Sequence, residues 1–299
     1  MISFRYHLVT IVAVFLALGL GLLAGTTVIN RVLVDRLRKQ TDQATNRADT
    51  AERARVELRN EVAALVPSIV ADKLATDVVL VTYEGSDSTT LNQAQASLKA
   101  AGANVLGVLP VTSRVSDPDA SKSLAKILGV PALTPAGVLQ RELATQLARR
   151  LSGAAPHGSG GANDLLNELI SNGFIRKGDI SPQTLKEIGQ DGQVVVAVSG
   201  GEPRPSPQPS SLMVPLVKEL VGQMPVAAGE PSNSSDGLVT LLRADGDLNQ
   251  GQLVTVDDLD RQVGGAALVL GLEQLLRSPT DGGGSYGLDG GTLILGDNL

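Results

Sequence analysis

The most distinctive pattern of the chain lies at its start, where residues 6–30 contain no Lys, Arg, Asp or Glu. A helix of about 20 apolar residues crosses the hydrocarbon core of a bilayer, and backbone groups in lipid can bond only within a helix. The pattern therefore predicts a membrane-spanning helix over residues 8–29, within an anchor of residues 1–30. A buried core helix fits less well, because no polar face interrupts the run. A cleaved signal peptide remains an alternative, since small residues near the end of the run suit cleavage: Gly19, Gly21, Ala24 and Gly25.

The charges on either side of this run favour opposite orientations. The positive-inside rule favours a cytoplasmic body, because only Arg5 precedes the run while four basic residues follow it closely. A very short N-terminal tail and a signal-like start favour a body on the other side of the membrane. The basic residues that follow are Arg31, Arg36, Arg38 and Lys39.

The next stretch, residues 31–66, is charged and contains neither Gly nor Pro. Small and apolar residues recur there at seven-residue spacing, which predicts a coiled-coil helix that associates with a second copy of itself. The alternative is a solitary stalk helix or one that packs on the body. The stronger row is Leu37, Ala44, Ala51, Leu58 and Leu65, and the weaker row is Val34, Thr41, Ala48, Arg55 and Val62.

Helix and strand patterns alternate after Pro67, which is expected to end the stalk helix. Alternating strands and helices predict a mostly parallel sheet covered on both faces, so residues 67–299 are expected to form an α/β domain. The Gly-rich residues 281–291 are expected to drape as a tail or form a binding loop. Strands are predicted at short apolar runs over 78–81, 105–108, 193–198, 225–228 and 253–256. Helices are predicted over 91–101, 118–128, 135–151, 165–170, 182–188, 212–221 and 266–277.

Composition removes several classes of function. The net charge of −6 leaves no basic footprint for nucleic acid, so no nucleic-acid partner is expected. The chain has no cysteine, which excludes disulfides, thiolate nucleophiles and Cys-based metal sites. No arrangement of residues typical of a catalytic site is visible either, so the protein is not expected to be an enzyme.

Ligands in open α/β sheets gather at the carboxyl ends of the strands. Three predicted strands end in acidic turns that contain Glu84, Glu202, and Asp257 with Asp258. Carboxylates that converge there can hold a cation, although Asp is also common as a helix cap and Gly eases turns. His7, at the mouth of the predicted span, is the fifth candidate metal ligand. The Gly200-Gly201 pair lacks a nucleotide-binding pattern around it, and the prolines that follow prevent a helix from starting there.

Several segments, taken in order, resemble the copper-transport outer-membrane protein family of actinobacteria (the MctB type). The N-terminal segment, residues 1–7 followed by the apolar run at 13–18, is the most distinctive. The other segments are Gly173-Phe174-Ile175, residues 194–201, residues 255–260, and Tyr286-Gly287.

This resemblance implies a cell-envelope protein that contributes to copper efflux and copper tolerance, with its body outside the cytoplasmic membrane and without enzyme activity. A single span cannot line a pore, so channel activity would require a homo-oligomer. Copper is then a transported ion and not a tightly bound cofactor. An envelope scaffold with no direct role in copper handling is the alternative, since the chain has few soft-metal ligands: three Met and two His.

Overall fold

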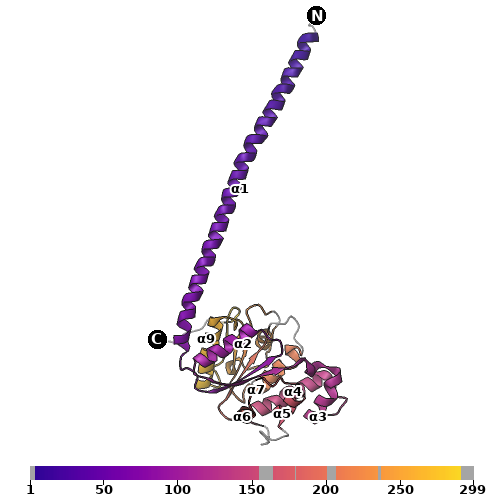
Figure 1. Ribbon diagram of the computed structural model, residues 1–299, viewed down its shortest axis with the longest axis vertical. Helices are drawn as coiled ribbons and strands as arrows, with labels where there is room; N and C mark the ends of the chain where they lie inside the picture. The colour runs from indigo at the N-terminus through magenta and orange to yellow at the C-terminus, as the bar shows by residue number, and fades with distance from the viewer. Residues whose placement is uncertain (1–3, 155–163, 179, 201–206, 235–236, 291–299) are drawn as a thin grey trace. The chain divides into compact units, whose positions relative to one another are not determined.

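The computed structural model describes residues 4–154, 164–178, 180–200, 207–234 and 237–290. For residues 4–5, 24–35, 59 and 63 it describes the helical backbone alone. The chain divides into two compact units, Met1–Glu61 and Val62–Leu299. Unit 2 holds the sheet and all of the described helices except most of α1 (Figure 1).

Helix α1 (Phe4–Val70) runs from the first unit into the second. Within it, Tyr6–Leu23 is long and apolar enough to cross a membrane by length and composition, a test that a signal sequence also passes. None of that window is buried within the protein. The predicted helix over residues 31–66 is confirmed as helix, while its pairing with a second copy stays a prediction.

The six strands of unit 2 form one sheet in the order β2-β1-β3-β4-β5-β6, and every pairing is parallel. The predicted α/β fold class is thus confirmed. The chain passes from β2 back across β1 to β3, so the topological switch point lies between β1 and β3. The strands are β1 (Asp77–Tyr83), β2 (Asn104–Val111), β3 (Val194–Val198), β4 (Val226–Gly229), β5 (Leu253–Val256) and β6 (Gly284–Tyr286).

Helices cover both faces of the sheet (Figure 1). Alternate side chains of a strand point to opposite faces, so Val79 and Val81 enter one core while Val78 and Leu80 enter the other. The second core is covered by α2 (Ser88–Ala100), α9 (Gln262–Arg277) and the last turns of α1. The first core is covered by α3 (Ser121–Leu128), α4 (Ala136–Leu151), α5 (Leu165–Ser171), α6 (Pro182–Glu187), α7 (Met213–Leu220) and α8 (Leu238–Ala244). Short 3₁₀ turns occur at Ser113–Ser116, Pro118–Ala120, Pro209–Ser211 and Gln250–Gln252.

The expectation that Pro67 ends the first helix is wrong, because α1 continues through Pro67 to Val70. Proline removes one backbone hydrogen bond from a helix, which favours a break. Here Val66 and Val70 are buried in the second core, and this packing holds the last turn in place.

The C-terminal segment also differs from expectation. Gly284–Tyr286 is the sixth strand of the sheet and not a draped tail. Helix α8 and β6 were not predicted, because a seven-residue helix and a Gly-Ser-Tyr strand show too little periodicity. The helix expected to start at Pro118 begins at Ser121, after a 3₁₀ turn that Asp117 caps.

A buried ion pair joins three helices under the first core. The Arg150 Nε atom lies 2.6 Å from Asp164 Oδ1, and both residues are about 95% buried. The guanidinium also donates to the carbonyl oxygens of Leu185, at 2.9 Å, and Ile188. Arg150 therefore ties the end of α4 to the start of α5 and the end of α6.

Candidate functional site

The acidic residues at the carboxyl edge of the sheet fall into separate groups. Glu230 follows β4 and Asp257-Asp258 follow β5, so they lie on neighbouring strands. Glu84 follows β1, which lies three strand positions from β5, or about 14 Å at the usual spacing of strands. The structure therefore does not bring Glu84 beside Asp257.

Asp257 is held by three donors from two segments. Its Oδ2 atom accepts from Arg243 Nη1 at 2.6 Å and from the Asp289 amide at 2.9 Å, while Oδ1 accepts from the Leu288 amide at 2.6 Å. The turn that supplies these amides contains Gly287 at φ +110°, a conformation that favours glycine. The carboxylate of Asp257 is thus engaged by the protein itself.

Arg243 extends this contact into a clamp on the last strand. Besides Asp257, its guanidinium donates to Thr255 Oγ1 at 3.0 Å and to the Tyr286 carbonyl oxygen at 2.7 Å. Arg243 belongs to α8, Thr255 to β5 and Tyr286 to β6. We call the contact of Arg243 with Asp257 and Tyr286 the C-terminal clamp.

Asp258 has a different environment from its neighbour. It is 5% exposed, and its Oδ1 atom has no hydrogen-bond partner among the described residues. Burial, followed by the nearby Asp257 charge, raises the pKa of the Asp258 carboxyl. Two glycines border this oxygen: a Cβ atom would lie 2.6 Å from it at Gly264 and 3.0 Å from it at Gly287. Asp258 thus offers a buried oxygen that no donor among the described residues contacts.

Glu230 is a buried acid that the sequence did not single out. It is 2% exposed, and burial raises its pKa. Its Oε2 atom accepts from the Val239 amide at 3.1 Å and from Ser234 Oγ at 3.4 Å, so it caps the start of α8. The only signal in the sequence is its position directly after a short apolar strand, the same signal that pointed to Asp257.

The remaining predicted ligands are Glu84, His7 and Glu202. Glu84 forms an ion pair with Arg176, and both side chains are partly exposed. His7 is exposed on α1, in the other unit. Glu202 lies outside the described residues. Within the described part of the chain, no three His, Asp or Glu side chains are arranged to hold a metal ion. The metal role of these five residues stays a prediction.

At the topological switch point between β1 and β3, the described polar groups of Asp87 form hydrogen bonds within the protein. Asp87 accepts from the Thr90 amide at 2.7 Å and from Thr90 Oγ1 at 2.6 Å, which caps α2 and lowers the pKa of Asp87. Its own amide donates to the Gly200 carbonyl at 3.0 Å. Tyr83, at the end of β1, is buried, and burial raises the pKa of its phenol.

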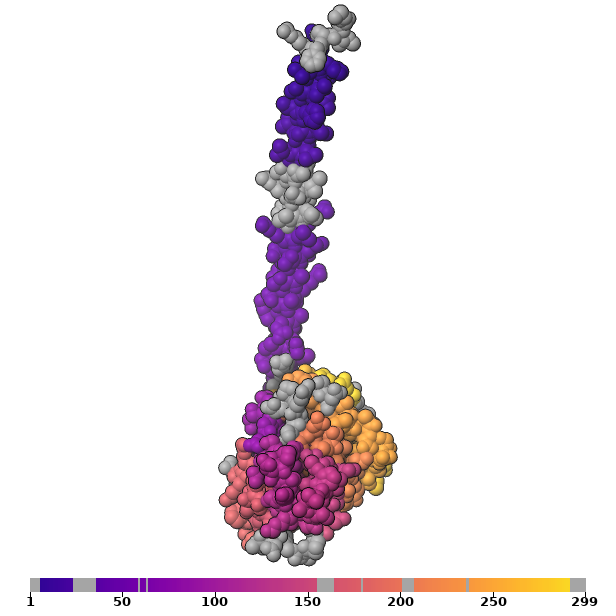
Figure 2. Space-filling model, turned by 90° about the vertical axis from the view of Figure 1, so that its right-hand side faces the viewer, coloured from indigo at the N-terminus to yellow at the C-terminus, as the bar shows by residue number. Residues whose placement is uncertain are grey.

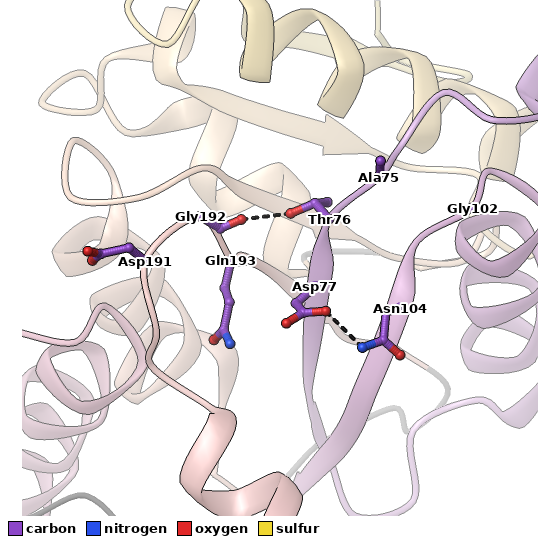
Figure 3. A pocket seen from close by; sticks show the side chains of 8 residues that line it. All are labelled: Ala75, Thr76, Asp77, Gly102, Asn104, Asp191, Gly192 and Gln193. Atoms are coloured by element: carbon purple, nitrogen blue, oxygen red, sulfur yellow. Dashed lines mark hydrogen bonds between the residues drawn. The ribbon is translucent and has the colours of Figure 1, made fainter.

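A polar pocket of about 380 Å³ lies at the opposite, amino-terminal edge of the sheet (Figure 3). Asp77 Oδ1 accepts from Asn104 Nδ2 at 2.8 Å, and Thr76 Oγ1 donates to the Gly192 carbonyl at 2.7 Å. Figure 3 shows the Asp191 side chain pointing away from Asp77. The lining groups therefore bond to one another or face away, and they do not converge on a ligand.

The sequence comparisons span both units. Residues 1–293 match the sequence model of a family described as "Copper transport outer membrane protein, MctB". The chain belongs to this family. Proteins named "Copper transporter MctB" from Mycobacterium tuberculosis and Mycobacterium bovis are 25% identical to it over 321 residues. The aligned region covers 98% of this chain and 98% of each relative.

The MctB family is named for transport and not for catalysis. Its match confirms the resemblance seen in the sequence, and it includes α1 as well as the sheet. The soft-metal donors described here do not converge: Met213 is fully buried in the first core, while Met224 packs against that core at the other end of α7. Among the described residues, the thioether sulfurs of Met213 and Met224 therefore do not form a shared copper site.

Proposed function

We propose that this protein is a membrane-anchored copper-transport protein that contributes to copper efflux and copper tolerance. The observation that carries the proposal is the family match over residues 1–293, which includes the apolar helix and the entire sheet. Relatives named as copper transporters align over nearly their whole length. The sequence similarity therefore extends from the apolar helix through the α/β domain, and it is not limited to a domain of a widespread fold.

The proposed location is a membrane, with one span over residues 8–29 in contact with lipid and unit 2 in the cell envelope outside the cytoplasm. The exposed apolar window Tyr6–Leu23 supports the span. The family description supports a place in the envelope, against the count of basic residues after the span.

The proposed assembly is a homo-oligomer through residues 31–66, since one span cannot enclose a path for an ion. Three leucines of the stronger heptad row are exposed in the single chain: Leu37 by 53%, Leu58 by 61% and Leu65 by 59%. Large exposed apolar side chains at this spacing are typical of a helix that pairs with another.

Copper, in this proposal, passes as copper(II) held weakly by carboxylates, because a transported ion must leave each contact that it enters. Asp258 is the strongest candidate contact, since Asp257 beside it is occupied by Arg243 and two amides. Glu84, Glu202 and His7 are proposed as separate single contacts. No tightly bound cofactor, no catalysis and no nucleic-acid partner are part of the proposal.

The second candidate is an envelope scaffold with no direct copper role. One observation favours it: the described residues contain no group of three His, Asp or Glu side chains placed to hold a metal ion. A scaffold would present its surfaces to other proteins and would change copper levels only indirectly.

A complementation experiment separates the two candidates. A strain that lacks the protein is supplied with the wild type, with Asp258→Ala, with Asp257→Ala, or with His7→Ala, at equal membrane abundance. The transport proposal expects Asp258→Ala to restore copper tolerance less well than wild type. Asp247→Ala is the matched control, because that carboxylate is 94% exposed and does not follow a strand. If every variant restores tolerance equally, none of these side chains carries copper and the scaffold is favoured.

A further inference from the structure

The loop between α3 and α4 carries the most exposed large apolar side chain described outside α1. Residues 129–138 contain no charged residue. Leu133, at the middle of this loop, is 91% exposed, and Val138 is 43% exposed. A lone exposed leucine is ordinary, but here Pro131, Ala132 and Pro135 beside it are exposed as well. We call residues 129–138 the apolar tip.

Hydrogen bonds fix the shape of this tip. The Thr134 amide and hydroxyl both donate to the Pro131 carbonyl, at 3.0 and 2.7 Å. The Val138 amide donates to the Pro135 carbonyl at 2.9 Å, where α4 begins. Gly129, at φ +69°, ends α3 in a left-handed conformation. The turn thus holds Leu133 outward before any partner arrives, so little ordering entropy is lost on binding.

The charged residues within the chain segment that carries the tip are all positive. Residues 120–141 include Lys122, Lys126 and Arg141 but no Asp or Glu, although the whole chain has a net charge of −6. Lys122 and Lys126 are exposed one turn apart on α3. Arg141 is also exposed, and its Nε atom donates to the Gly137 carbonyl at 3.3 Å, which places it beside the tip. Asp119 and Glu142 bound the stretch.

The tip belongs to a different face of unit 2 from the end of α1. Leu128 and Leu139, which flank it, are buried in the first core, whereas Val66 and Val70 of α1 are buried in the second. Figure 2 looks onto the α3 side of unit 2, where the segment around α3 and α4 appears in magenta. Within unit 2, the tip therefore lies over a different face of the sheet from the last turns of α1.

We propose that the apolar tip is a second membrane contact, which inserts Leu133 and its neighbours into the interface of an anionic bilayer. Apolar groups at the centre with basic groups around them match acyl chains bordered by anionic headgroups. One leucine and three cations bind weakly alone, but the anchor keeps unit 2 near lipid and raises the effective concentration. The inference does not depend on the proposed role in copper transport.

The absence of cysteine makes the test specific. Ala132→Cys gives the full chain one attachment site for an environment-sensitive dye while Leu133 stays in place. The labelled protein is reconstituted in phosphatidylcholine vesicles, with or without phosphatidylglycerol, and empty vesicles of either composition are added. We expect a blue shift of the dye, and quenching by spin-labelled lipid, when phosphatidylglycerol is present. A dye on Asp247→Cys, another exposed position, should not respond.

Two further variants assign the effect. Leu133→Asp should weaken the lipid contact about ten-fold or more, because a leucine no longer enters the interface. Lys122→Glu with Lys126→Glu should remove the preference for phosphatidylglycerol, while Lys99→Glu on α2, on the other face, should not. The proposal is overturned if the dye at position 132 shows neither a blue shift nor quenching with phosphatidylglycerol, whether that lipid is in the protein's own vesicles or in the added ones. It is also overturned if the shift depends on protein density and not on lipid, since the tip would then bind a second copy.

Discussion

Arg243 and Asp257 form a salt bridge of 2.6 Å that fastens the last strand of the sheet, because the same guanidinium also donates to the Tyr286 carbonyl. Their side chains are 17% and 9% exposed. Strand β6 has only three residues and no apolar run of its own. Its place in the sheet therefore depends on these charges and on the two amides that bind Asp257.

Removal of the arginine should loosen this strand. We expect Arg243→Ala to lower the free energy of unfolding by about 3 kcal/mol, since it leaves a buried carboxylate without its partner. Urea unfolding of the full chain in detergent, followed by circular dichroism, measures the change. Lys218→Ala is the matched control: it breaks the more exposed pair with Asp245, which solvent screens, and should lower the free energy of unfolding much less. Equal losses for the two variants would contradict the clamp.

The buried ion pair of Arg150 with Asp164 should contribute a similar amount to the free energy of unfolding. We expect Arg150→Met to cost about 3 kcal/mol, because Asp164 and the carbonyls of Leu185 and Ile188 lose their donor. The neighbouring Arg149→Met is the control, since Arg149 is exposed on the same helix. If thermal unfolding moves equally for both, Arg150 does not hold the three helices together.

The buried acid at the carboxyl edge makes stability depend on pH. Burial raises the pKa of Asp258 in the fold above its value in the unfolded chain, so the fold favours the protonated form. Its contribution is fully present below the unfolded pKa and is lost as pH rises through the folded pKa. We expect the free energy of unfolding of the wild type to decline as pH rises above the ordinary pKa of an aspartic acid, and Asp258→Asn to remove this part of the decline.

The exposed Asp247→Asn is the control for this titration, and it should leave the pH dependence as in the wild type. The measurement is a series of urea unfolding curves across that pH range. If the free energy of unfolding changes with pH in the same way for the wild type and for Asp258→Asn, burial of the Asp258 carboxyl does not affect stability, and the prediction is wrong.

The heptad row of α1 predicts self-association of the full chain. We expect Leu58→Asp combined with Leu65→Asp to convert an oligomer into a monomer, because two exposed leucines of one seam become charged. Val56→Asp is the matched control: Val56 is also exposed and apolar, but it lies outside both rows. Sedimentation in detergent reports the mass. A wild-type chain that sediments as a monomer would leave α1 as a solitary stalk.

The parts of the fold that the sequence predicted are those fixed by local pattern. Runs such as Val194–Val198 are buried on both faces, so an unbroken apolar run indicates a strand without further context. Strand β6 lacks such a run, and its pairing depends on Arg243, which is distant in sequence. The prediction that the first helix ends at Pro67 was wrong for a similar reason. The burial of Val66 and Val70 outweighs the helix-breaking tendency of proline.

The candidate site was predictable only in part. Asp257 and Asp258 follow a strand, so their place at the carboxyl edge follows from the parallel sheet. Their different environments do not, because Arg243 and two amides bind Asp257, while the Asp258 Oδ1 atom beside Gly264 and Gly287 has no donor in the described part of the chain. The distance of Glu84 from this pair depends on strand order, which the sequence pattern did not give.

The central claim is that the protein contributes to copper efflux, and the copper content of cells tests it most directly. Cell-associated copper is measured in the parent, in a strain lacking the protein, and in that strain carrying the wild-type chain, during growth with a copper salt. We expect cells without the protein to hold more copper and to tolerate less of it, and the wild-type chain to restore both to the level of the parent. Equal copper content in the parent and the deletion strain would contradict it.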